Sequence, residues 1–146
     1  MLPQIKPLEQ IIRLNVSLFK NCLAGVTDDI ACKRPNDRTN NIAFIALHVV
    51  NAWYHIARCL SLDIHDPFEE QYKHVASVDQ CATFPPVAEM ITAWENVSSI
   101  LSARCELVSE EELVVPSKIK LSGCDQTVLD ELTFLVQHES YHIGQL

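Results

Sequence analysis

The chain has 146 residues, of which 48% are hydrophobic and only 3 are glycine, and its formal net charge is −8. This length predicts one domain, residues 1–146, that buries a core without disulfide or metal staples. The acidic charge argues against a nucleic-acid partner, because affinity for phosphate backbones comes largely from clustered lysine and arginine. No apolar run approaches the roughly 18 residues of a membrane span, and MLPQIKPLEQ lacks the apolar core of a signal peptide. We therefore expect a cytoplasmic protein with no membrane partner.

The six cysteines do not form a disulfide or zinc pattern. They are spaced 10 to 27 residues apart and include no C-x-x-C pair. Because nothing in the sequence indicates export, we interpret them as reduced thiols, several of them buried as small apolar side chains. The six are Cys22, Cys32, Cys59, Cys81, Cys105 and Cys124.

Helical periodicity begins near Pro7 and continues to about Leu23, where Gly25 follows as a stop signal. The segment 27–30 predicts a short helical turn, which Pro35 ends. A second long helix should open at Thr39 or Asn40 and run to about residue 61. One face of it carries Phe44, Ile45, His48, Asn51, Ala52 and His55. A histidine on such a face is usually a packed core residue.

Periodicity fails between residues 62 and 86, where proline-containing dipeptides break any helix. A connection of this length is often functional, and in a bundle it would carry the chain from one end to the other. Phe68 and Tyr72 could anchor it over a pocket, whereas His65 and His74 read as solvated loop residues.

Pro85 or Pro86 suits the first turn of a third helix, whose apolar stripe continues to Val108. The acidic run 110–112 reads as a solvated helix end. A second irregular connection, with a short extended piece, leads to a fourth helix capped by Thr127. Four long amphipathic segments without an internal repeat predict an all-α fold, a single four-helix bundle with a long connection between its second and third helices.

The fourth helix carries His138 and His142, four residues apart, so both imidazoles project from one face about one turn apart. His48 lies on a core-facing surface of the second helix, and His55, two turns further along that face, is an alternative ligand. Metal sites in bundle cores are built from such inward side chains. Three imidazoles suit zinc, nickel, iron or copper and leave coordination positions open. The competing interpretation is two helix-end histidines and one buried histidine without a metal.

The same stretch also matches H-E-x-x-H, the zincin signature, in which Glu139 would be the general base. We do not favour a protease. The best-known zincins take a third ligand downstream of the motif, and only residues 143–146 follow it here. No strand pattern for a substrate-binding sheet is evident either. A supporting polar role for Glu139 next to a metal ligand remains open.

Two stretches resemble the DinB-like family of helical bundles. They are NNIAFIALHVVNAWYHIA and the terminal HESYHIGQL. That family pairs one histidine on helix two with H-x-x-x-H and a G-Q pair on helix four, which here are His48, His138, His142 and Gly144-Gln145. The resemblance implies a homodimer with a three-histidine divalent metal site, and zinc or nickel as the metal. Relatives continue the last helix beyond this motif, so we expect a frayed site or a shortened protein at Leu146.

Characterised relatives include thiol-dependent transferases and isomerases. The resemblance therefore implies a metal-dependent enzyme, a thiol S-transferase or a hydrolase-like enzyme, that joins a low-molecular-weight thiol to a small electrophilic substrate. Tyr141, Glu131 and Asn51 are candidates for supporting the ligands, and no residue is assigned as acid or base. The alternatives are a non-catalytic metal-binding or stress-associated bundle acting through dimerisation, and a bundle without a metal.

Overall fold

The computed structural model describes residues 1–72, 74–118 and 127–146. Within these ranges the chain forms seven α-helices and one 3-10 helix, and no strand. The elements are α1 (Ile5–Leu23), α2 (Asp28–Ala31), α3 (Ile42–Cys59), α4 (Glu69–Tyr72), η1 (Val78–Gln80), α5 (Val87–Leu107), α6 (Glu110–Leu113) and α7 (Val128–Ile143). The predicted all-α bundle is confirmed. The expected extended piece is reduced to an isolated bridge between Pro116 and Thr127, and residues 119–126 lie outside the described part.

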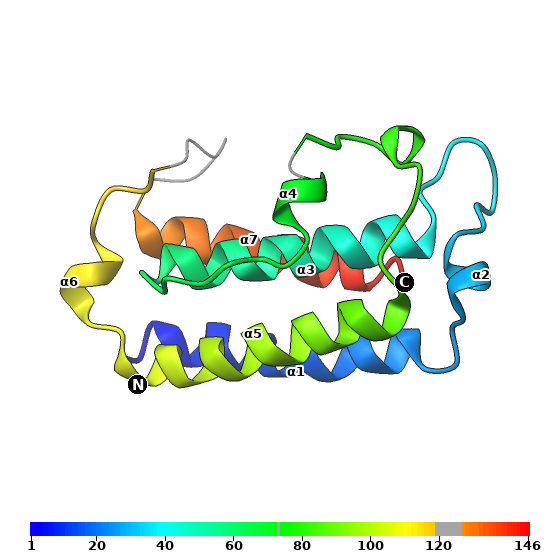
Figure 1. The fold of residues 1–146 in the computed structure, drawn as a ribbon. Helices are drawn as coiled ribbons and strands as arrows, with labels where there is room; N and C mark the ends of the chain where they lie inside the picture. Colours follow the sequence, from blue (N-terminus) through cyan, green and yellow to red (C-terminus); the bar gives the residue numbers. More distant parts are fainter. Residues whose placement is uncertain (73, 119–126) are drawn as a thin grey trace.

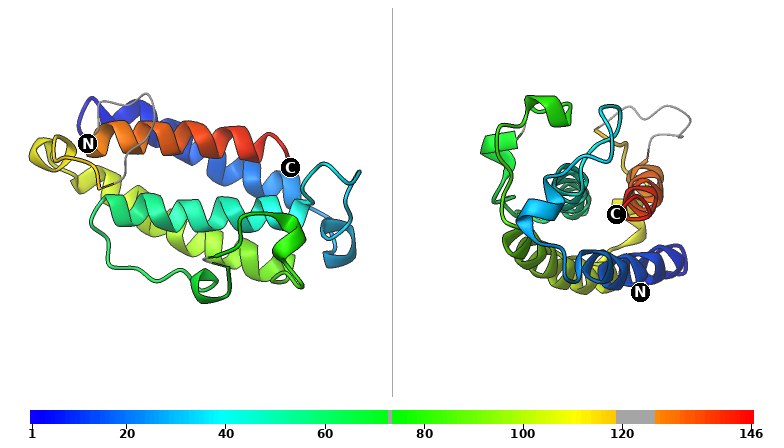
Figure 2. Two further views of the ribbon diagram at one scale, coloured as in Figure 1. Left: turned by 90° about the horizontal axis from the view of Figure 1, so that it is seen from above. Right: turned by 90° about the vertical axis from the view of Figure 1, so that its right-hand side faces the viewer.

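The four long helices α1, α3, α5 and α7 stand at the corners of a bundle (Figures 1 and 2). Helix α3 packs against α5 and α7, and α1 packs against the same two helices, so α1 and α3 are diagonal. The connection between α3 and α5 starts at one end of the bundle and returns to the other (Figure 1), so these two helices run in the same direction. The predicted crossover is therefore present, with the short helices α4 and η1 inside it.

Helix ends follow local capping chemistry. The Asn41 side chain accepts a hydrogen bond from the backbone N–H of Phe44, so α3 begins one to two residues later than expected from Thr39 or Asn40. Helix α1 begins at Ile5 rather than Pro7, because proline is tolerated in a first turn whose N–H groups lack intrahelical partners. Helix α3 ends at Cys59. Ser61 follows in the left-handed region with φ of 61°, a common way to terminate a helix.

The centre of the core is aromatic. Phe19 from α1 and Trp53 from α3 both stack on Trp94 from α5, each with ring centroids 4.4 Å apart. All three rings are fully buried, and the Trp53 indole N–H donates to the Ser98 hydroxyl at 2.9 Å. A buried indole with a satisfied N–H contributes apolar contact area without the cost of an unpaired donor. This centre fixes α3 against α5 and so presents the other side of α3 to α7.

The crossover is fixed at its start by a buried carboxylate. Asp66 is 1% exposed; one of its oxygens accepts from the Asn51 side chain on α3, and the other accepts from the backbone N–H of Phe68 at 2.8 Å. Further along, the Tyr72 hydroxyl donates to the Thr83 carbonyl at 2.8 Å. Phe68 is buried against the core, as the sequence predicted for an anchor. The connection is thereby held along the outer side of α3 (Figure 2).

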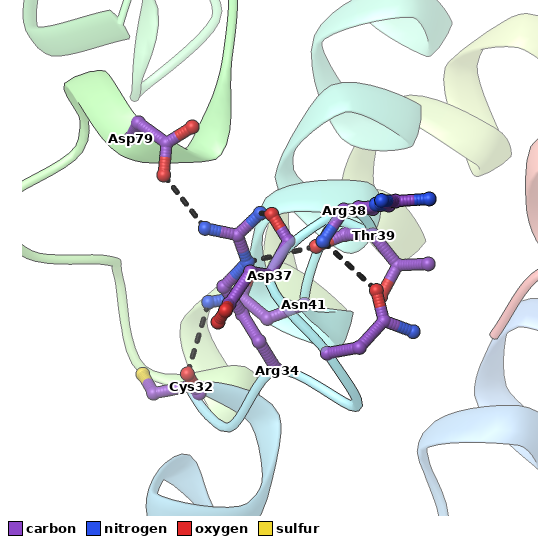
Figure 3. Close-up of polar contacts among 8 residues, drawn as sticks. Cys32, Arg34, Asp37, Arg38, Thr39, Asn41 and Asp79 are labelled. Carbon is purple, nitrogen blue, oxygen red and sulfur yellow. Dashed lines mark hydrogen bonds and ion pairs between the residues drawn. The ribbon is translucent and has the colours of Figure 1, made fainter.

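The turn between α2 and α3 is organised by one arginine (Figure 3). Arg34 donates to the carbonyls of Asp37 and Thr39 and pairs with Asp79 at 2.6 Å, which ties this turn to the crossover. The Asn41 amide also donates to the Cys32 carbonyl at 3.1 Å. The predicted short turn of helix is present as α2, and the start of α3 is fixed on both sides.

Helix α3 is, within the described residues, the one helix long and apolar enough to cross a membrane by length and composition. Its 18 residues have a mean hydropathy of 1.2, and half of them are buried inside the bundle. The statement that no apolar run approaches this length was therefore too strong. Packing against α5 and α7 accounts for the apolar composition, since the core helix of a bundle is hydrophobic on several sides.

The five cysteines in the described ranges are free thiols, and Cys124 lies outside those ranges. Cys105 is buried in the core, Cys32 is exposed, and the other three are half-buried.

Candidate metal centre

Three histidines from two helices meet on the seam between α3 and α7. His48 comes from α3, and His138 and His142 come from α7. One ring nitrogen from each lies within 4.8 Å of the others, and the Nε2 atoms of His138 and His142 are 3.0 Å apart. The His48 ring stands edge-on to both, with ring centroids at 5.4 Å and 4.6 Å. We call this group the histidine triad. The structure brings together all three residues that the sequence singled out.

Two neighbouring side chains fix the orientation of the α7 imidazoles. The Nδ1 atom of His138 lies 3.1 Å from a carboxylate oxygen of Glu139, and Nδ1 of His142 lies 2.7 Å from the side-chain oxygen of Gln145. Carboxylate and amide oxygens are acceptors, so these two contacts favour the tautomer of each imidazole that carries its proton on Nδ1. In that tautomer each Nε2 atom carries a lone pair, and the two Nε2 atoms lie 3.0 Å apart. Such an arrangement needs a cation, or a shared proton, between the nitrogens.

Burial keeps two of the three imidazoles neutral. Burial, with smaller contributions from the neighbouring His142 and His138, lowers the pKa of His48 to about 4. The pKa of His142 is also lowered, mainly by burial. The pKa of His138 is instead raised, because Glu139 hydrogen-bonds to it. Neutral imidazole is the form that binds metal ions, so His138 is the member at which protons compete most strongly.

Glu139 is a completely buried carboxylate. Its exposed fraction is 0%, one oxygen faces His138, and the other has no hydrogen-bond partner among the described residues. Burial raises its pKa to about 7, against the opposing effect of His138. A carboxylate behind a histidine is the usual support of a metal-ligating imidazole. A positive ion at the triad would offset the unpaired buried charge.

Of the three residues expected to support the ligands, two have partners elsewhere and the third makes only a ring contact with the triad. Asn51 holds the crossover through Asp66. Glu131 contacts His55 and Cys59 near the other end of α3. Tyr141 is 59% exposed and only places its ring beside His142, with centroids 5.2 Å apart.

His55, the alternative ligand, lies with Glu131 in that separate group rather than in the triad. The sequence did not resolve the two groups, because His48 and His55 share one face of α3 and only the position of α7 separates them.

The donor set fits a divalent transition metal. Two imidazole nitrogens that bind one zinc ion at about 2.0–2.1 Å lie about 3.3 Å apart in a tetrahedral site. The observed 3.0 Å between the Nε2 atoms of His138 and His142 is close to that spacing. Three protein ligands also leave at least one coordination position for water or substrate.

A zincin arrangement does not fit. Glu139 lies in the core on the Nδ1 side of His138, away from the nitrogen that faces the other histidines, so it is not placed as a base at the metal.

A family model described as the DinB superfamily matches residues 11–146. The chain belongs to the DinB superfamily. No curated protein matches it. The match covers α3, α5 and α7 of this DinB-superfamily protein in full and α1 from residue 11 onward. It includes the three histidines, so the resemblance drawn from two short motifs holds for nearly the whole chain.

Two supporting residues of this DinB-superfamily site were not assigned a role from sequence. Gln145 belongs to the G-Q pair that the resemblance picked out, and its position three residues after His142 is the signal for a side-chain contact. For Glu139 a supporting polar role was left open, because helical geometry turns it only modestly away from the direction of His138 and His142. Its side chain reaches Nδ1 of His138 from within the core.

Proposed function

We propose that this DinB-superfamily protein binds one divalent transition-metal ion through the histidine triad. The observation that carries the proposal is the 3.0 Å separation of the two Nε2 atoms, in imidazoles whose Nδ1 atoms face acceptor oxygens of Glu139 and Gln145. His48 supplies the third nitrogen from the facing helix. Zinc and nickel are the metals we expect, since imidazole suits both and neither needs a carboxylate-rich site.

Elemental analysis of protein purified without an affinity tag tests the proposal. The wild type should carry metal at the triad, and His142→Ala should lose that equivalent while remaining helical by circular dichroism. His65→Ala is the matched control, because His65 is an exposed residue of the crossover, and it should leave the metal content unchanged. Equal metal content in all three proteins would refute the ligand assignment.

We further propose that the bound metal serves a thiol-dependent transfer reaction on a small electrophile, as the family resemblance implies. A divalent metal bound there would favour the thiolate form of a low-molecular-weight thiol at neutral pH. The chain's own residues do the positioning: Glu139 and Gln145 hold two imidazoles in place, and burial keeps His48 unprotonated. His138 is 32% exposed in its side chain, so the triad is reachable from solvent.

The space beside His48 limits what the site accepts without movement. A cavity of about 30 Å³ lies there, lined by residues of α3 and by Tyr72 and Val75 of the crossover. A cavity of this size holds about one water molecule. A thiol cofactor must therefore approach over the exposed edge of His138, or the crossover must move.

This small volume favours the second candidate, a non-catalytic metal-binding protein. Cobalt-substituted protein separates the two functions. A thiol that enters the coordination sphere changes the visible spectrum and should do so at millimolar concentration if the transferase proposal holds. If no low-molecular-weight thiol changes the spectrum, the transferase proposal is refuted and the non-catalytic function is retained.

The expected homodimer also remains a proposal. Ile11, Leu14 and Leu18 of α1 are exposed and spaced three and four residues apart, so they form an apolar stripe suited to a second copy of the chain. Sedimentation of wild type and of Leu14→Lys tests it, with a monomer expected for the variant.

A further inference from the structure

A second group of side chains that could hold a metal lies on the same seam, where the last turn of α3 meets the first turn of α7. These two helix ends lie at the same end of the bundle as α6 (Figure 1). His55 and Cys59 are one turn apart on α3, and Glu131 faces them from α7. One carboxylate oxygen of Glu131 lies 3.2 Å from His55 Nε2 and accepts from the Cys59 thiol at 3.0 Å. One donor atom from each residue lies within 4.8 Å of the others. We call this group the mixed cluster.

The types of donor atom suit a particular class of ion. Thiolate, imidazole and carboxylate are all zinc ligands, and a thiolate excludes the hard ions magnesium and calcium. Glu131 is 4% exposed and Cys59 is half-buried, so both side chains are already held by packing. The other carboxylate oxygen of Glu131 accepts from the Ser117 hydroxyl at 2.7 Å, which fixes the carboxylate from behind.

We infer that His55, Cys59 and Glu131 form a second transition-metal site, separate from the histidine triad and selective for zinc-like ions. Binding replaces the thiol proton that now faces Glu131, and that proton leaves to solvent. One thiolate and one carboxylate then balance the charge of a divalent ion, with neutral imidazole as the third ligand.

A cavity of about 290 Å³ adjoins the mixed cluster and gives such an ion an open position. All three residues line it, together with apolar side chains from the α3 terminus, the 115–116 segment and α7. Its other charged lining residues are Lys118, Arg58, which pairs with Glu69, and Glu112, which pairs with Arg104. The fourth ligand is therefore water or another small ligand that enters from this cavity. The volume of the cavity approaches that of the smaller ligand pockets.

The two sites are too far apart to share one ion. His48 and His55 are seven residues apart on α3, as are Glu131 and His138 on α7, and seven residues of α-helix advance about 10 Å. The proposal that the mixed cluster binds a metal therefore does not depend on metal binding at the triad. The competing account is a hydrogen-bond network alone, in which Cys59, His55 and Ser117 satisfy the buried carboxylate.

Cobalt(II) titration of the metal-free full-length protein distinguishes these accounts. Among the two groups only the mixed cluster contains sulfur, so a near-ultraviolet sulfur-to-cobalt charge-transfer band reports on Cys59 alone. The band should appear in the wild type, persist in His142→Ala and in the matched control Cys81→Ser, and vanish in Cys59→Ser. No band in the wild type, or a band that survives in Cys59→Ser, would overturn the inference. Loss of metal from His142→Ala with the band intact separates the two sites.

A second measurement needs no variant at the cluster. Zinc at stoichiometric concentration should slow alkylation of Cys59 more than about tenfold while leaving the exposed Cys32 unaffected, as read by peptide mass spectrometry. Alkylation of Cys59 at the same rate with and without zinc would count against the site even if Cys59→Ser failed to fold.

Discussion

The histidine triad and the mixed cluster are built on the same two helices, yet they differ in the charge of their donor atoms. The triad offers three imidazoles, which bind a metal without contributing negative charge, and Glu139 and Gln145 support two of them from behind. The mixed cluster offers an imidazole together with a thiol and a carboxylate that must both be ionised to bind. A bound divalent ion would keep its full charge at the triad and lose it at the mixed cluster. That difference suits the triad to activating an anion and the mixed cluster to tight binding of the ion itself.

The two groups also handle their buried carboxylates differently. Glu131 has donors on both oxygens, and hydrogen bonds from Cys59, Ser117 and His55 outweigh the effect of burial and lower its pKa. One carboxylate oxygen of Glu139 faces His138, and the other has no hydrogen-bond partner among the described residues. Burial raises the pKa of Glu139 to about 7. In the metal-free protein the mixed cluster is thus electrostatically satisfied, whereas the triad is not.

The largest effect should follow from His138→Ala. Metal affinity at the triad should fall more than about a hundredfold, beyond what loss of a supporting residue costs. In addition, Glu139 loses its partner, so the metal-free variant should be about 1–3 kcal/mol less stable than wild type. Urea denaturation in the presence of a chelator measures the second effect. His142→Ala leaves no buried group unpaired, so it should change the stability of the metal-free protein little. Equal losses of stability in the two variants would contradict this account of Glu139.

Glu139→Gln should have the next largest effect and should change the pH dependence of metal binding. Loss of the carboxylate behind His138 should weaken binding about 10- to 100-fold at pH 8. Glu139 raises the pKa of His138, so in wild type protons begin to displace metal as the pH falls through a range above 6.5. In the variant this displacement should begin at lower pH. Competition titrations at several pH values measure both changes, and an unchanged pH profile would show that Glu139 does not act through His138.

Thr127→Ala should destabilise the first turn of α7 and leave the end that carries His142 unchanged. The Thr127 side chain accepts from the Asp130 N–H, and Asp130 reciprocates in a capping box. Loss of this cap should cost about 1 kcal/mol and fray the turn that carries Glu131. Hydrogen exchange should then speed up at the first turns of α7 and not around His142. Uniform acceleration along the helix would argue that the seam opens as a unit.

The smallest effect should come from Tyr141→Phe. Tyr141 is largely exposed and contacts His142 only through its ring, which phenylalanine preserves. Metal affinity and stability should change by less than about 0.5 kcal/mol. A larger loss of affinity would indicate that the hydroxyl takes part in binding.

Much of the fold and of the triad followed from the sequence. Helical spacing placed His138 and His142 on one face, and the resemblance paired them with His48. Both predictions were possible from sequence because each depends only on a single helix or a short motif. The long crossover was also foreseen from its prolines. The start of α3 was misjudged because Thr39, Asn40 and Asn41 are all good caps, and only the contacts of Asn41 with Phe44 and Cys32 decide among them.

The mixed cluster was not foreseen, for a physical reason. His55 and Cys59 are an i,i+4 pair, but their partner Glu131 lies on another helix, and which carboxylate reaches them depends on how α3 and α7 are aligned. That alignment is set by the whole core, including the stack of Phe19, Trp53 and Trp94, rather than by any local pattern. The same argument explains why Glu131 was assigned to the triad.

The equal seven-residue steps on α3 and α7 tie the two groups to one register of the helix pair. If α7 slid along α3 by a single turn, about 5.4 Å, both groups would come apart together. An ion bound at one group would therefore hold α3 and α7 in the register that the other group needs. Metal binding at one group should therefore raise the metal affinity of the other. This thermodynamic linkage is transmitted by the two rigid helices rather than by any contact between the ions.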